Sequence, residues 1–150
     1  MELINDKDII NILKKGAEFF IDTFIKNVYS QSTWNGDPLM ENSPSWKAFK
    51  INKGYGDMSL IYKDHDFINP NMWNIKVKDN NMITVQMANR LNNKLNDLRL
   101  IDDRYGKNYT KIVPDNDLSI VEKYIEKELM KLLKFKLSKI KFYADVKVVV

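Results

Sequence analysis

The chain has 150 residues, of which 44% are hydrophobic and 11% aromatic, a composition typical of a folded globular protein and not of a disordered one. It contains no cysteine, so no disulfide can form, and no apolar run approaches the roughly 18 residues that a membrane-spanning helix requires. These features predict one cytosolic domain over residues 1–150. The formal charge is +4, and from Ser119 onward eight lysines face four acidic residues, so the excess positive charge lies in that segment.

The first predicted element is a helix that begins at Asn5 or Asp6, either of which can cap it, and ends near Ser30. Its apolar residues recur at spacings of three and four, as expected for a helix with one buried face. They are Ile9, Ile10, Leu13, Ala17, Phe20, Ile21, Phe24, Ile25 and Val28.

Residues 31–45 are predicted to be a connecting loop, because Asn35-Gly36-Asp37-Pro38 and Ser43-Pro44-Ser45 are turn-forming sequences. The loop also carries Trp34, Leu39 and Met40. Large apolar side chains on a loop either fold back onto the core or remain exposed for a partner. These three residues are the candidates for a protein-binding interface.

Short strands are then predicted over residues 46–51 and 58–63, joined by a glycine-containing turn. A hairpin follows, in which Trp73, Ile75 and Val77 alternate with polar residues, and so do Ile83, Val85 and Met87. Pairing the apolar residues across the two strands requires a loop of three residues, 79–81, with Asn81 in the left-handed conformation.

The remaining predicted elements are a helix over residues 88–99, a short strand over residues 109–113, a helix from Ser119 and a strand over residues 140–150. Ser119 and Glu122 have the spacing of a capping box at the start of that last helix. From Ile140 to Val150 the apolar residues fall at every second position, which is typical of a strand with one buried face. Together the elements predict an α+β fold with a mainly antiparallel sheet of about five to six strands, packed against N-terminal, middle and C-terminal helices.

The only histidine lies in Asp64-His65-Asp66, the sharpest cluster of possible metal ligands. On an extended strand the two carboxylates share one face while His65 points away, so the tripeptide alone cannot chelate an ion. A solvated turn is the favoured interpretation, and no metal or other cofactor is predicted. A metal-dependent hydrolase built on these residues is the least favoured function.

A second candidate site is a run of five lysines in the C-terminal segment, in which no acidic residue intervenes between Leu129 and Ala144. Dense lysines can follow phosphates, and the neighbouring aromatic residues could stack on bases. The same lysines also suit an ordinary exposed helix face, and we favour that interpretation. The candidates for nucleic-acid binding are Lys131, Lys134, Lys136, Lys139 and Lys141.

No family is recognised from the sequence. The bias toward asparagine and lysine, with 17 asparagines and only three arginines, is typical of an AT-rich genome. In general character the chain is similar to small accessory proteins of phages and mobile elements, anti-CRISPR inhibitors among them. The sequence therefore favours a cytoplasmic, non-enzymatic protein that binds and inhibits a larger protein machine. The alternative is a nucleic-acid-binding module, and only weak, non-specific binding of nucleic acid is expected. No association with a membrane is expected.

Overall fold

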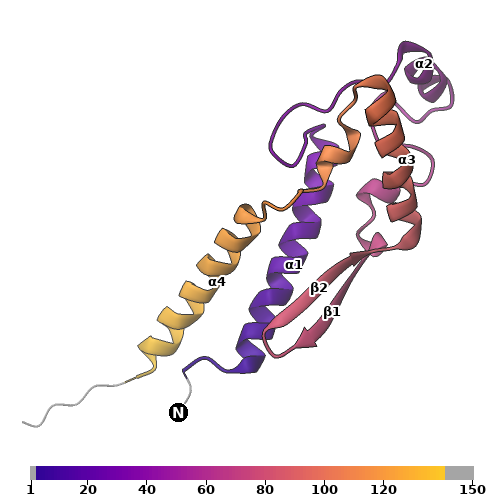
Figure 1. The fold of residues 1–150 in the computed structure, drawn as a ribbon. Coiled ribbons are helices and arrows are strands. Elements are labelled where there is room, and N and C mark those ends of the chain that lie inside the picture. Colours follow the sequence, from indigo (N-terminus) through magenta and orange to yellow (C-terminus); the bar gives the residue numbers. More distant parts are fainter. Residues whose placement is uncertain (1–2, 141–150) are drawn as a thin grey trace, which may run out of the picture.

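A computed structural model describes residues 3–140 and contains four α-helices, three short 3-10 turns and one β-hairpin. The helices are α1 (Asp6–Tyr29), α2 (Pro44–Asn52), α3 (Asn89–Tyr105) and α4 (Ser119–Ser138), and the strands are β1 (Trp73–Asp79) and β2 (Met82–Met87). The 3-10 turns are η1 (Asp66–Ile68), η2 (Pro70–Met72) and η3 (Tyr109–Ile112). The long helices α1 and α4 lie side by side, and the hairpin packs along α1 (Figure 1). Helix α2 lies at one end of the molecule, near α3 (Figure 1).

Helix α1 is the central element, and its predicted cap and buried face are confirmed. Asn5 and Asp8 form a reciprocal capping box, in which each side chain accepts a hydrogen bond from the other residue's backbone N–H. Phe24 and Val28 are fully buried, and the Phe24 ring meets Trp73 of β1 edge-on with 5.0 Å between the ring centroids. This face of α1 therefore joins the hairpin to the core.

The opposite side of α1 packs against α4, and the two helices are antiparallel. The Phe19 and Tyr124 rings stack at 4.3 Å, Lys15 lies 3.8 Å from Glu128, and Asp8 lies 3.4 Å from Lys136. Gly16 lies between these contacts. A Cβ atom at Gly16 would lie 2.6 Å from Cγ1 and 2.7 Å from Cδ1 of Ile125, so the two helices approach closely because this residue has no side chain.

The close approach at Gly16 predicts that alanine, although a better helix former by about 1 kcal/mol, destabilises the protein. Over-packing of this kind costs about 1–3 kcal/mol, so we expect Gly16→Ala to lower the midpoint of urea unfolding. In an Ile125→Ala background the clash is gone, and there Gly16→Ala should raise the midpoint. If Gly16→Ala raised the midpoint in both backgrounds, the α1–α4 contact would not be close at this residue.

In the hairpin the predicted register is confirmed, and the predicted turn is wrong. Trp73 pairs with Met87, Ile75 with Val85, and Val77 with Ile83. Asp79 then pairs with Met82, so the extra residue is a bulge at Lys78 and the turn contains only two residues. Asn81 does not have a positive φ. The apolar faces determine which residues pair, but they do not indicate that the unpaired residue is Lys78 of the strand and not a residue of the turn.

The predicted sheet of five to six strands is wrong, because the described residues 3–140 form a single two-stranded sheet. Residues 46–51 belong to helix α2. The Ser43 side chain accepts a hydrogen bond from the Trp46 backbone N–H, and Pro44 occupies the first helical turn. Ser43-Pro44 is thus a helix start. Proline has no backbone N–H, and in the first turn of a helix that N–H would have no partner within the helix.

The two other internal strands are also absent from the described chain. Residues 58–63 form a loop in which Leu60 has a φ of 66°, and Ser59 is tied to Gln31 by two backbone–side-chain hydrogen bonds of 2.7 and 3.0 Å. Residues 109–112 form η3, where the carboxylate of Asp102 accepts hydrogen bonds from the backbone N–H groups of Tyr109 and Thr110. Hydrogen bonds from side chains to the backbone, which apolar alternation does not detect, shape both segments.

The ends of the last two helices differ from the prediction as well. Helix α3 continues to Tyr105 and stops at Gly106, which has a φ of 63° and closes the last turn by donating its backbone N–H to the Asp102 carbonyl. Helix α4 begins at Ser119 without a side-chain cap on Leu118, so the predicted capping box of Ser119 and Glu122 is wrong; the Asp117 side chain accepts a hydrogen bond from the Ser119 backbone N–H. Apart from Ile140, which is exposed, the predicted strand over residues 140–150 lies outside the described residues.

Candidate binding cleft

A cleft with a volume of about 970 Å³ lies between α2, the loop over residues 60–67 and α3. A volume of that size is within the range of known ligand-binding pockets. Its walls are predominantly apolar and aromatic, with a few charged groups among them. The apolar and aromatic side chains of the walls include Trp46, Leu60, Tyr62, Leu98, Ile101 and Tyr105.

Helix α3 forms one wall because it has two adjacent apolar faces. Leu91 and Leu95 are fully buried in the core. Leu98, Ile101 and Tyr105 follow at spacings of three and four on the neighbouring face, which borders the cleft. Ile101 is 39% exposed and Tyr105 is 62% exposed, so this face remains largely uncovered.

Helix α2 and the loop after it form an aromatic wall. Trp46 stacks on Phe49 with 5.2 Å between the ring centroids and lies 5.2 Å from Tyr62, whose ring also meets Tyr55 edge-on. The Trp46–Phe49 stack follows from the helical spacing of three residues. Trp46 and Phe49 are each more than 40% exposed. The rings therefore stabilise one another and still present apolar surface to solvent.

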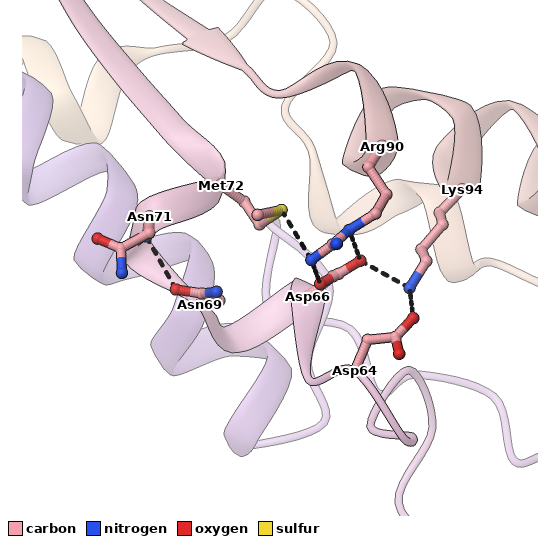
Figure 2. A network of polar contacts seen from close by, with 7 residues as sticks. All are labelled: Asp64, Asp66, Asn69, Asn71, Met72, Arg90 and Lys94. Atoms are coloured by element: carbon pink, nitrogen blue, oxygen red, sulfur yellow. Dashed lines mark hydrogen bonds and ion pairs between the residues drawn. The ribbon is translucent and has the colours of Figure 1, made fainter.

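Among the residues that line the cleft is Asp66, whose carboxylate is held by two cations from α3 (Figure 2). Arg90 donates two hydrogen bonds to it, of 2.9 Å to Oδ2 and 2.7 Å to Oδ1. The Nζ atom of Lys94 lies 2.7 Å from Asp66 Oδ2 and 2.7 Å from Asp64 Oδ2. The Asp66 side chain has no exposed surface, whereas 60% of the Arg90 side chain is exposed. This network fixes the loop over residues 64–66 to α3.

The same contacts shift the pKa values of the network. Burial by itself raises the pKa of Asp66, but the hydrogen bonds and positive charges of Arg90 and Lys94 outweigh it and hold that pKa below its usual value. Lys94 lowers the pKa of Asp64. In turn, burial acts to lower the pKa of Lys94, but the two carboxylates raise it above the ordinary lysine value. Asp64, Asp66 and Lys94 are therefore held in their charged forms.

The geometry removes the basis for the metal interpretation of Asp64, His65 and Asp66. The two carboxylates bind Lys94 and Arg90, and His65 has a left-handed φ of 55° between them. Within residues 3–140 no group of three or more histidine, cysteine or acidic side chains could hold a metal ion. The predicted solvated turn is wrong for Asp66, which is buried in a structural ion pair.

Lys50 also belongs to the wall of the cleft, although only 1% of the residue is exposed. Its Nζ atom donates a hydrogen bond to the backbone carbonyl of Met58. Burial lowers the pKa of Lys50 below the ordinary lysine value, and the negative charge of Asp57 opposes that shift. The fold therefore buries the positive charge of Lys50 without placing a carboxylate of residues 3–140 in contact with it.

Comparison with protein-family models, with curated proteins and with solved structures gave no match. The function must therefore be inferred from the geometry of the chain itself. In the described part of the chain, no helix has the length and apolarity needed to cross a membrane.

The structure separates the three residues that the sequence suggested as interface anchors. Trp34 is 5% exposed and Leu39 is 7% exposed, and both belong to the main hydrophobic core, where Trp34 packs on Phe20. Their burial removes the reason for assigning them to an interface. Met40 is 42% exposed and remains a candidate interface residue. The loop folds back because the backbone N–H of Leu39 donates a hydrogen bond to the Gln31 carbonyl and that of Met40 donates one to the Asn108 side chain.

The candidate lysines of α4 do not form one basic surface. Lys131, Lys134, Lys136 and Lys139 spread over roughly 200° of the helix, at about 100° per residue. Lys131 pairs with Glu128, Lys136 pairs with Asp8, and Lys139 lies over the Phe135 ring. Lys141 lies outside the described residues. The arrangement resembles an ordinary exposed helix more than a track for phosphates.

Sequence reasoning missed the cleft because it predicted a strand where α2 lies and ended the helix of α3 near residue 99. The signals were present: Ser43-Pro44 is a helix start, and Gly106 is a helix stop that extends the leucine pattern of α3 to Tyr105. Lys50 carries no signal of its own, since a lysine on a short helix is normally exposed.

Proposed function

We propose that this protein is a non-enzymatic binding protein and that the cleft between α2 and α3 is where it binds another protein. The observation that carries the proposal is the exposed apolar surface that borders the cleft. Trp46, Ile101 and Tyr105 line it and are all substantially exposed. Aromatic residues gathered at one uncovered site are typical of the centre of a protein interface.

A protein partner is favoured over a small molecule because apolar exposure continues outside the cleft. Phe49 stacks on Trp46 without lining the cleft and is 42% exposed, and Leu100, next to Ile101, is 70% exposed. A small ligand inside the cleft would leave these side chains in water. A segment of a folded partner could cover the cleft and its borders together, which is the larger gain in buried apolar area.

The structure also gives reasons to prefer this proposal to the two alternatives. The described lysines of α4 are spread around the helix and half of them are paired, which weakens a nucleic-acid interface. The carboxylates suggested for a hydrolase are bound by α3 cations. We further propose that the protein acts by binding and blocking its partner in the cytosol. The absence of cysteine fits that reducing compartment, where disulfides are rare.

Tyr105→Ala tests the site, with Phe135→Ala as a matched control. Both residues are aromatic, lie in the last turns of helices and are similarly exposed, at 62% and 57%, and each ring has a basic side chain over it. Only Tyr105 borders the cleft. We expect Tyr105→Ala to weaken the partner complex by about tenfold or more, which corresponds to about 1.4 kcal/mol, while Phe135→Ala leaves it unchanged.

The measurement is cross-linking and affinity capture from the source cell with tagged wild-type and variant proteins, with and without nuclease. Equal loss of the captured partner in both variants would place the interface elsewhere. Loss of all captured material after nuclease treatment would favour the nucleic-acid alternative.

A further inference from the structure

Lys50 is a buried cation for which the fold supplies only part of the required bonding. Its ammonium group has three donors. The Met58 carbonyl accepts one hydrogen bond, and no acidic side chain among residues 3–140 lies within ion-pair distance of it. The residue is only 1% exposed, so bulk water does not readily replace the missing acceptors.

Such an arrangement is costly for the folded protein. A buried charge destabilises the fold unless it is paired and hydrogen-bonded. The lowered pKa of Lys50 reflects that cost, with burial as the larger influence and the charge of Asp57 opposing it. Methionine would fill nearly the same volume without the charge, so packing alone does not explain a lysine here.

The other two lysines that border the cleft, Lys94 and Lys107, are less buried than Lys50, so water can reach them. Lys94 binds Asp64 and Asp66, and Lys107 donates a hydrogen bond of 2.8 Å to the Glu41 carbonyl. Lys50 thus differs from them in being buried while its ammonium group makes a single hydrogen bond within the described chain. A carboxylate brought into this predominantly apolar cleft would make a stronger, charge-assisted bond than it could make on the open surface.

From this charge complementarity we propose that the partner segment that enters the cleft carries an aspartate or glutamate among apolar residues, and that this carboxylate pairs with Lys50. The apolar residues of the segment would contact Trp46, Tyr62 and Ile101, and the carboxylate would use the free donors of Lys50. This inference rests on the proposed protein-binding function and adds the chemistry of the occupant.

The test is selection from a displayed library of random linear peptides on wild-type protein and on Lys50→Met. Wild-type protein should enrich apolar peptides with one acidic residue, and Tyr105→Ala should weaken their binding by about tenfold or more. Lys50→Met should enrich apolar peptides without that acid. For an enriched peptide, replacing its acid with the matching amide should weaken binding to wild type by about tenfold or more and leave binding to Lys50→Met unchanged.

The possible failures are distinguishable. Failure to enrich any peptide that depends on Tyr105 would count against the proposed function itself. Enrichment of apolar peptides without an acid, bound equally by wild type and Lys50→Met, would leave the cleft as a binding site and overturn the role of Lys50.

Two controls guard against a trivial loss of folding. We expect Lys50→Met to melt at the same temperature as wild type or higher, because a buried unpaired charge is removed. The acid-to-amide change in the peptide tests the same pair on the unaltered protein, so the proposal remains testable if the variant does not fold. NMR titration of Lys50 gives an independent measurement: its pKa should rise when an acidic peptide binds and stay constant with the amide peptide.

Discussion

Phe24→Ala is expected to remove a large part of the stability of the protein. Phe24 is fully buried on α1, and its ring packs edge-on against Trp73 of the hairpin. Deleting a buried phenylalanine side chain costs about 3–5 kcal/mol, from lost burial and from the cavity that remains. A domain of this size is stable by only about 5–15 kcal/mol, so the variant should unfold at a much lower urea concentration.

Phe49→Ala is the matched control, because it makes the same chemical change on α2 at a residue that is 42% exposed. Exposed substitutions change stability by about 0.5 kcal/mol or less. Loss of the stacking contact with Trp46 could add a similar amount. Far-ultraviolet circular dichroism in urea measures both variants. Equal midpoints for the two variants would show that the α1–hairpin contact does not form the core.

The parts of this fold that could be predicted from the sequence are those in which one strong local pattern has no competitor. The apolar stripe of α1 and its cap at Asn5 were predicted correctly, because 24 helical residues repeat one period. The register of the hairpin was also correct, since a shift by one residue would turn Ile75 and Val85 to the wrong side.

The parts that failed are short segments, where a few apolar residues fit a helix, a strand or a loop equally well. Residues 46–51 contain Trp46, Phe49 and Ile51, and the capping by Ser43 decided in favour of a helix. Residues 58–63 are held by Gln31, a residue about 28 positions earlier in the chain, as its hydrogen bonds to Ser59 show. A contact so distant in sequence leaves no periodic signal near the segment that it shapes.

For the candidate site, the sequence identified the right tripeptide for the wrong reason. Asp64 and Asp66 were singled out as possible metal ligands, whereas their partners are Arg90 and Lys94 on α3. The two cations are four residues apart, so both point from the same face of a helix toward the same loop. Neither separation in the sequence nor composition indicates that α3 and this loop meet.

Asp66→Ala is expected to destabilise the protein and to weaken its dependence on pH. The carboxylate is buried and accepts three charged contacts, so its removal leaves Lys94 and Arg90 with fewer partners and breaks the link between the loop and α3. Breaking a buried ion pair costs about 3–5 kcal/mol. Because Arg90 is 60% exposed and can be solvated, we expect a loss at or below the lower end of that range.

The pH dependence follows from the direction of the pKa shift. Since the pKa of Asp66 is lower in the folded protein than in the unfolded chain, its ionised form contributes stability above the unfolded value of about 3.9. That contribution is lost as the pH falls through the lowered folded pKa. Asp64 adds in the same sense, because Lys94 lowers its pKa as well.

Urea unfolding between neutral and acidic pH separates these effects. Wild-type stability should fall steeply below the unfolded pKa of aspartate, and the curve of Asp66→Ala should be flatter, with the smallest difference from wild type at the lowest pH. Asp115→Ala is the control, because Asp115 makes only an exposed ion pair with Lys111 and should behave as wild type. Parallel pH curves for wild type and Asp66→Ala would mean that the loop is bound to α3 by something other than the Asp66 carboxylate.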